Sequence, residues 1–240
     1  MATNLGLPVH TVPSSKGRLK PFQHALLDNQ AETGVSVLEM QEFEKGVDAG
    51  PIFGQTRHAI PPMADFRQLR HDLAVKGGDL LVDVLRQMLA GKATSEPQPS
   101  DSTTPEARHI EFEDSLADFS AMTAEEISRR YRAVWPKNTR CYLNNGHTIQ
   151  LYAPVYLESA PEGILSLLSS PGLATYDDSS SGLLVRCAND TILRVPQVKA
   201  RYTKVISAQE WWDSVKPEQR VENNNISPVV LFSRRVQKTN

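Results

Sequence analysis

The chain has 240 residues, with 26 Lys and Arg against 28 Asp and Glu, so that its formal net charge is −2. Hydrophobic residues make up 40% of it and charged residues 22%, which excludes collagen-like, disulfide-scaffold and wholly disordered proteins. The near-neutral charge argues against a wholesale polycation such as a histone, although it does not exclude local basic patches. This length allows one large domain or two smaller ones.

The two cysteines, Cys141 and Cys187, are too few for a disulfide framework and favour a reducing compartment. Neither lies in a CxxC pair or at metal-ligand spacing from a histidine, so we expect two buried thiols and no metal site. No run of about 18 apolar residues is present, and we therefore expect no transmembrane helix and no membrane partner. The first residues lack the pattern of a signal peptide, and no transit peptide is visible.

The predicted elements of the first ninety residues alternate between strand and helix. Strands are expected at Leu7–Val12 and Thr33–Met40, with a helix at Pro21–Leu27 between them. Apolar residues at helical spacing predict a long amphipathic helix from Asp65 to Leu89. This order of elements predicts a small α/β layer with a parallel sheet.

A segment rich in Pro, Ser and Thr, Lys92–Arg108, predicts a linker. After it, the T-x-x-E pattern at Thr123–Glu126 predicts a capped helix that ends at Pro136. Short β-rich runs separated by turn residues then predict a small OB-like β-barrel. These runs are Arg140–Leu143, Thr148–Leu157, Gly182–Cys187, Thr191–Val195 and Lys204–Ile206, followed by a closing helix at Ala208–Val215.

The predicted organisation is therefore an α/β layer over residues 1–91, a linker over 92–108, a barrel domain over 109–215 and a polar tail over 216–240.

Four stretches of the sequence resemble a known family. Residues 23–37, QHALLDNQAETGVSV, followed by residues 47–55, VDAGPIFGQ, are similar to the core of the folate-dependent formyltransferase domain, and residues 69–85 continue the similarity. Residues 110–134 resemble the opening of the tRNA-binding C-terminal domain of the methionyl-tRNA formyltransferases. The paired matches point to that family, with a partial, Rossmann-like formyltransferase layer in front of the barrel.

The resemblance implies a catalytic aspartate at Asp48, within the D-x-G segment Asp48-Ala-Gly50. The family's N-x-H-P-S-L-L-P strand has no clear counterpart, because Pro8 stands where its Asn is expected two residues before His10. His10 is therefore a catalytic candidate in one alignment. In the other, preferred alignment, residues 7–13 correspond to an earlier strand, and much of the layer is absent.

The implied function is formyl transfer from 10-formyltetrahydrofolate to the methionyl group of initiator Met-tRNA during translation initiation, by a monomeric one-carbon transferase. The acid-rich insertion Gln41–Lys45 and the diverged linker favour a mitochondrial, fungal-like member. Two alternatives stay open. One is a truncated, catalytically inactive tRNA-binding protein, and the other is a related folate-dependent formyltransferase.

Two windows without acidic residues, Ile127–Leu157 and Thr191–Gln209, favour RNA binding, because cations near phosphates release counterions. Their aromatic residues could stack on bases. The candidate RNA-binding residues are Arg129, Arg130, Arg132, Lys137, Arg140, Lys199, Arg201 and Lys204.

Overall fold

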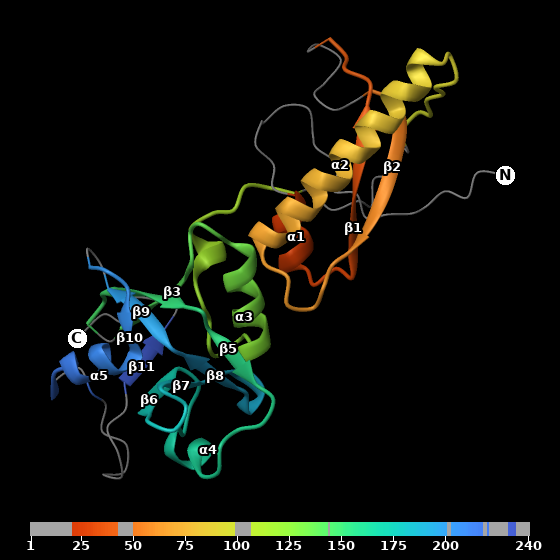
Figure 1. Ribbon diagram of the computed structural model, residues 1–240. Helices are drawn as coiled ribbons and strands as arrows, with labels where there is room; N and C mark the ends of the chain where they lie inside the picture. Colours follow the sequence, from red (N-terminus) through yellow and green to blue (C-terminus); the bar gives the residue numbers. More distant parts are fainter. Residues whose placement is uncertain are drawn as a thin grey trace. The chain divides into compact units, whose positions relative to one another are not determined.

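The computed structural model describes residues 21–42, 50–98, 107–143, 145–200, 203–217, 220 and 230–233. The chain divides into two compact units, Met1–Ile110 and Glu111–Asn240, which are taken in turn below (Figure 1). The predictions for the strand Leu7–Val12 and for His10, Asp48 and Arg201 lie outside the described residues.

Among its described residues, the first unit contains two helices and a two-stranded sheet. Its elements are α1 (Pro21–Leu27), β1 (Glu32–Leu38), β2 (Ile52–Ala59) and α2 (Phe66–Leu89). The predicted helices are confirmed, and Asp65 caps α2 by accepting a hydrogen bond from the Gln68 N–H at 2.8 Å. Helix α2 lies across the hairpin, where a Cβ on Gly54 of β2 would stand only 3.1 Å from Leu80 of α2.

The two described strands of this sheet pair antiparallel, from Glu32 opposite Ala59 to Leu38 opposite Ile52. Strand β2 was not predicted from the sequence. Antiparallel strands can be joined by a short connection, whereas a parallel pair needs a crossover, usually a helix. The predicted parallel sheet followed from the order of the strand at Leu7–Val12, the helix α1 and the strand at Thr33–Met40. It stays a prediction, because residues 7–12 lie outside the described residues.

The second unit is a nine-stranded antiparallel sheet with short helices. The sheet has the order β10-β9-β4-β3-β11-β6-β7-β8-β5. Its strands are β3 (Thr139–Leu143), β4 (Thr148–Tyr152), β5 (Val155–Leu157), β6 (Leu173–Asp177), β7 (Gly182–Arg186), β8 (Ile192–Val195), β9 (Gln197–Ala200), β10 (Ile206–Ser207) and β11 (Val230–Ser233). The helices are η2 (Glu113–Ser115), α3 (Ala124–Ala133), α4 (Ile164–Leu167), η3 (Ala188–Asp190) and α5 (Ala208–Ser214).

The barrel prediction is only partly matched, because β10 and β5 end the sheet and are not paired with each other among the described residues. The predicted strand over Thr148–Leu157 is two strands, β4 and β5, since Ala153 adopts a left-handed conformation with φ 47° and is followed by Pro154. Strands β6, β9 and β11 were not predicted.

Strand β11 corrects the prediction that residues 216–240 form a polar tail. Val230 and Leu231 pair with β6, while Phe232 and Ser233 pair with β3. The Phe232 side chain is 1% exposed, and its ring centroid lies 6.0 Å from that of Phe119 and 5.8 Å from that of Trp211. Val230 and Phe232, which lie inside a polar segment, therefore complete the core.

The core of the second unit also contains both cysteines, as predicted. Cys141 and Cys187 are free and fully buried. Burial raises the pKa of both thiols because it disfavours the thiolate, and for Cys187 the pKa rises to about 12.

We predict that Phe232→Ala lowers the free energy of unfolding of the second unit by about 3–5 kcal/mol, because it opens a cavity between two rings. The measurement is urea unfolding followed by tryptophan fluorescence. Val155→Ala is the control, since Val155 lies on an end strand and is 40% exposed. An equal effect of the two substitutions would contradict the assignment of β11 to the core.

Helix α3 begins with the predicted capping box. The Thr123 N–H donates to Glu126 Oε2 at 2.7 Å, and Glu126 N–H donates to Thr123 Oγ1 at 3.3 Å. The hydrogen bond from the Thr123 backbone lowers the pKa of Glu126 below its ordinary value, with partial burial acting in the opposite direction. The ionised carboxylate therefore contributes to stability, and this contribution is lost when pH falls through the lowered pKa.

We predict that Glu126→Gln destabilises the protein at neutral pH, and that the difference from wild type shrinks as pH falls below 4.5, the ordinary value. The measurement is the free energy of unfolding between pH 7 and pH 3. Glu125→Gln, on the exposed side of the same helical turn, serves as the control. A Glu126→Gln difference that stays constant over this pH range would contradict the role of the carboxylate.

Candidate nucleic-acid interface

The strands β3, β4 and β9 separate a buried face from a polar face. Thr139, Cys141, Ile149, Leu151 and Val198 alternate along the strands and are 0% exposed. The register places Arg140 opposite Gln150, and Gln150 opposite Lys199, in one row across the three strands on the other face. This row and its neighbours Tyr142, Thr148, Tyr152 and Gln197 are called the polar face below.

One tyrosine and two amides form a hydrogen-bond network at one end of the polar face. Tyr152 O–H donates to Gln150 Oε1 at 3.2 Å, and Asn138 Nδ2 donates to the Tyr152 hydroxyl oxygen at 3.2 Å. Partial burial raises the pKa of Tyr152, and the nearby Tyr131 adds to this shift while Arg140 opposes it. The phenol is therefore neutral at physiological pH and remains a hydrogen-bond donor.

Arg140 is held in place from two sides. Its Nη2 donates to the Lys137 carbonyl oxygen, and its guanidinium carbon lies 5.0 Å from the centroid of the Phe112 ring. Partial burial lowers the pKa of Arg140, while Tyr142 and Tyr152 oppose this shift. An arginine keeps its charge at neutral pH all the same, so the polar face carries a fixed cation.

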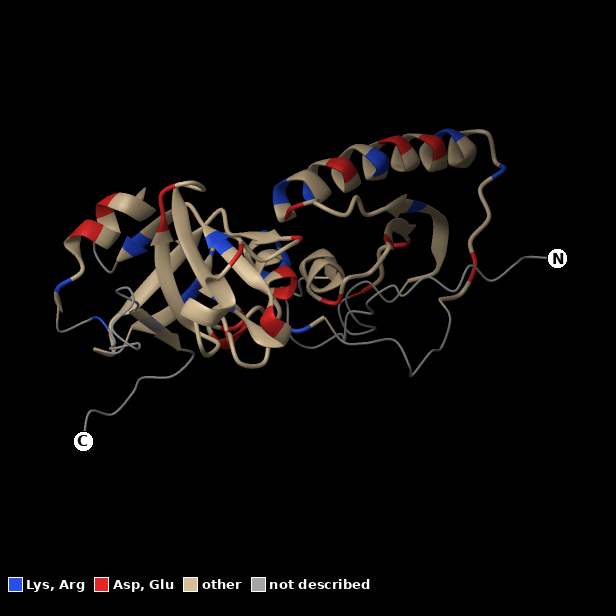
Figure 2. Cartoon of the chain, turned by 90° about the horizontal axis from the view of Figure 1, so that it is seen from below, with Lys and Arg blue, Asp and Glu red and all other residues tan. Residues whose placement is uncertain are grey.

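The remaining predicted cations lie on other elements. Arg129, Arg130 and Arg132 are half-buried on α3, and Arg130 Nη1 donates to the Asp114 carbonyl oxygen in η2 at 2.8 Å. Lys204 is exposed between β9 and β10, where its charge helps to lower the pKa of Glu210 after the larger effect of the hydrogen bonds from Ser207. Figure 2 marks these Lys and Arg residues in blue among the acidic residues in red.

The structure thus brings Arg140 and Lys199 into one row, whereas Arg130 serves a contact within the unit. Sequence reasoning missed Gln150, Asn138 and Tyr152 as parts of the interface. The signal that could have found Gln150 and Tyr152 is the alternation Thr-Ile-Gln-Leu-Tyr over residues 148–152, which assigns residues 148, 150 and 152 to one face.

The proposed catalytic residues Asp48 and His10 lie outside the described residues, but the end of the D-x-G segment is described. A Cβ on Gly50 would stand 2.0 Å from the Glu39 carbonyl oxygen, so only glycine fits there. The Gly50 carbonyl oxygen accepts a hydrogen bond from Gln98 Nε2 at 2.7 Å. The close approach of the Gly50 backbone to the Glu39 backbone therefore explains why residue 50 is a glycine.

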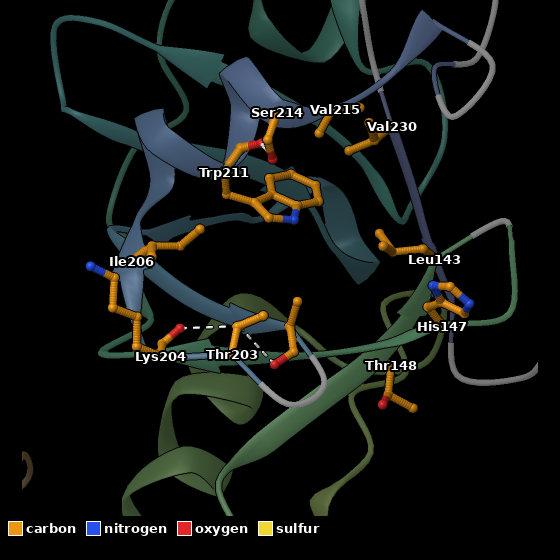
Figure 3. A pocket seen from close by; sticks show the side chains of 11 residues that line it. Leu143, His147, Thr148, Thr203, Lys204, Ile206, Trp211, Ser214, Val215 and Val230 are labelled. Carbon is orange, nitrogen blue, oxygen red and sulfur yellow. Dashed lines mark hydrogen bonds between the residues drawn. The ribbon is translucent and has the colours of Figure 1, made fainter.

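A pocket of about 630 Å³ lies between α5, β11 and the turn that joins β3 to β4 (Figure 3). Its lining combines apolar side chains, among them Leu143, Ile206, Trp211 and Val230, with polar ones. The polar lining residues are His147, Thr148, Thr203, Lys204 and Ser214. This lining contains no carboxylate that could pair with the imidazole or the ammonium group.

Other kinds of site were sought in the same residues. Among the residues that the structure describes, no group of three His, Cys, Asp or Glu side chains could hold a metal ion. None of the described helices is long and apolar enough to cross a membrane.

Comparisons with known proteins identify the second unit. Residues 109–216 match the family described as formyl transferase, C-terminal domain. The methionyl-tRNA formyltransferase of Janthinobacterium sp. (strain Marseille) is 30% identical over 191 residues, which cover 80% of this chain and 56% of that protein. The methionyl-tRNA formyltransferase of Myxococcus xanthus (strain DK1622) is 31% identical over 203 residues, covering 78% of this chain and 64% of that protein.

Solved structures share the fold. HypX from Aquifex aeolicus superposes with a TM-score of 0.59 at 15% identity, over 84% of this chain and 35% of HypX. An N-formyltransferase from Helicobacter canadensis, solved in complex with folinic acid and dTDP-3-aminofucose, superposes with a TM-score of 0.55 at 14% identity, over 79% of this chain and 62% of that protein. At these identities the likeness is one of fold.

The chain therefore carries a formyl transferase C-terminal domain over residues 109–216. The chain is similar in sequence to the two methionyl-tRNA formyltransferases named above, as the sequence resemblance predicted. It spans 56–64% of the length of these two curated relatives.

Proposed function

We propose that this chain acts in the transfer of a formyl group from 10-formyltetrahydrofolate to the methionyl group of initiator Met-tRNA, and that its second unit binds the tRNA. The observation that carries the proposal is the row of Arg140, Gln150 and Lys199 on the polar face. It lies within a domain that matches the formyl transferase C-terminal family.

The chemistry of the polar face suits a phosphate backbone. Arg140 and Lys199 neutralise phosphate charges, and Arg140 is oriented by Phe112 and the Lys137 carbonyl before any RNA arrives. Lys199 is half-buried on β9, directly opposite Gln150. The Tyr142 and Tyr152 rings offer surfaces on which unpaired bases can stack. Arg129, Arg132, Lys137, Arg201 and Lys204 extend the proposed contact.

Formyl transfer requires a donor for the oxygen on which negative charge develops, and a group that removes a proton from the attacking amine. We propose Asp48 as the catalytic aspartate that orients and charges a histidine, on the resemblance of the D-x-G segment. His10 is its candidate partner in one of two alignments. Both residues lie outside the described residues, so the proposal for catalysis rests on the resemblance.

The main alternative is a tRNA-binding protein without formyltransferase activity. It is favoured by the residues around His10, where Pro8 stands in the place of the Asn of the family's N-x-H-P-S-L-L-P strand. A related folate-dependent formyltransferase is less favoured, since both relatives named above act, by name, on methionyl-tRNA.

Three further points belong to the proposal. We expect the chain to be monomeric. The mitochondrial location expected from the sequence has no support among the relatives named above, which are bacterial.

The OB-like form of the second unit is supported by short antiparallel strands around one core. The Rossmann-like form of the first unit is supported by its fold likeness to formyltransferase structures.

We predict that Arg140→Ala and Lys199→Ala each weaken tRNA binding and lower the slope of log affinity against log salt by about one unit, because each removes one phosphate contact. The measurement is a binding isotherm for initiator tRNA at several salt concentrations. Lys92→Ala, which removes one exposed cation from the first unit, is the matched control. Unchanged affinity and slope in both variants would contradict the interface.

We predict that the purified chain formylates Met-tRNA in the presence of 10-formyltetrahydrofolate above a no-enzyme blank, and that Asp48→Asn abolishes this turnover without changing tRNA affinity. The measurement is transfer of labelled formyl to Met-tRNA at high enzyme concentration. A flat trace with intact tRNA binding would establish the non-catalytic alternative.

A further inference from the structure

The pocket of the second unit opens the apolar core to solvent. Trp211, Val215 and Val230 belong to the core and also line the pocket, and they are between 1% and 7% exposed. The pocket volume of about 630 Å³ falls within the range of about 300–1,000 Å³ that is typical of small-molecule and cofactor sites. The pocket is therefore large enough to hold a flat ring system.

The walls of the pocket offer hydrogen bonds as well as apolar surface. Figure 3 shows the indole nitrogen of Trp211 on the side of the ring that faces Leu143 and Thr203, and an indole N–H acts as a donor only. The Thr203 hydroxyl donates to the Ala200 carbonyl oxygen at 3.0 Å, and the Ser214 hydroxyl donates at 2.6 Å to a carbonyl oxygen of its own helix. Each hydroxyl oxygen keeps lone pairs with which it can accept. The pocket therefore suits a flat ring that carries both acceptors and donors at its edge.

The mouth of the pocket carries a positive charge. Lys204 and His147 are exposed and lie on opposite sides of the lining in Figure 3, where the Lys204 ammonium group points away from the other lining side chains. No carboxylate is among the described lining residues. Glu210 of α5 accepts hydrogen bonds from the Ser207 N–H at 2.8 Å and from the Ser207 hydroxyl at 2.9 Å. An anionic group of a ligand would therefore meet a cation outside the apolar walls.

The pocket adjoins the polar face. Thr148 belongs to both, since it lines the pocket and shares one face of β4 with Gln150 and Tyr152. On β9, Ala200 of the lining directly follows Lys199 of the cation row. Successive residues of a strand are only about 3.3 Å apart. A polyanion bound by Lys199 therefore lies next to the mouth of the pocket.

We propose that the pocket binds one unpaired nucleobase of an RNA whose phosphate backbone lies on the polar face. The base occupies the apolar walls, and its edge accepts from the Trp211 N–H and donates to the Thr203 or Ser214 hydroxyl oxygen. The flanking phosphate lies at Lys204. Unstacked bases of this kind are the usual targets of sequence-specific RNA recognition. The proposal rests on the proposed function, because it assigns one specific contact to the tRNA that the second unit is proposed to bind.

The first test measures binding isotherms of the full chain for initiator tRNA at several salt concentrations. Ser214→Phe places a ring in the pocket from an exposed position at the end of α5, and Ala200→Leu narrows the pocket from β9. We expect each variant to bind tRNA about tenfold more weakly than the wild type, because the base is excluded. The slope of log affinity against log salt should stay unchanged, since a base contact releases no counterions.

Gln209→Phe is the matched control for this test. It adds the same ring to an exposed residue of α5 that is not among the described lining residues. Its tRNA affinity should equal that of the wild type.

The second test needs no tRNA. The full chain is titrated with the nucleoside monophosphates of all four bases while the indole N–H resonances are followed by NMR. The sequence has three tryptophans, and Trp135→Phe and Trp212→Phe identify the resonance of Trp211. We expect at least one nucleotide to shift the Trp211 resonance. Ribose phosphate, which lacks the base, should leave it unchanged, and Ser214→Phe should abolish the shift.

Equal tRNA affinity in the wild type, Ser214→Phe and Ala200→Leu would overturn the pocket proposal and leave the polar face as the interface. So would the absence of a shift with every nucleotide, an equal shift with ribose phosphate, or a shift with folinic acid alone. Self-association that Ser214→Phe abolishes would assign the pocket to a second copy of the chain and would also overturn the proposal. A wild type that binds a nucleotide at Trp211 but does not bind tRNA would contradict the proposed function, while the pocket would remain a nucleobase site.

Discussion

The second unit depends on one short pairing, the insertion of β11 between β3 and β6. Without it, β10, β9, β4 and β3 would form one sheet, and β6, β7, β8 and β5 another. Phe232 of β11 lies between Phe119 and Trp211. The strand that joins the two groups of strands therefore also contributes a buried side chain to the core of the unit. The buried face of β3 and β4 therefore has a core to pack against, and the alternation of the strands turns Arg140 and Gln150 to the other side.

This connection makes the candidate interface a consequence of the fold. Thr139, Cys141, Ile149 and Leu151 are fully buried, and a shift of one residue in register would exchange them with the polar face. The cation row is consequently fixed by the same apolar side chains that stabilise the sheet. The position of the cations on α3 does not depend on the register of the sheet. Arg130, for example, donates to the Asp114 carbonyl oxygen and stabilises the turn before the helix.

Local signals predicted the helices well. The capping box at Thr123 and the apolar spacing that starts after Asp65 define α3 and α2, since both depend on residues close in sequence. Strand direction and partners could not be read in the same way. The antiparallel pairing of β1 with β2 and the docking of β11 depend on contacts between distant segments. Of the candidate site, the cations were predicted from charge, but their grouping depends on register, and the Tyr152–Gln150–Asn138 network depends on side-chain direction.

The two ends of the nine-stranded sheet are short. β10 has two residues and β5 has three, so each offers few free backbone groups to a strand from another molecule. Long, flat sheet edges invite pairing between molecules. Because β5 and β10 are short, the sheet can end in unpaired strands. Each end exposes only a short edge to which a strand of another molecule could add in an amyloid-like way.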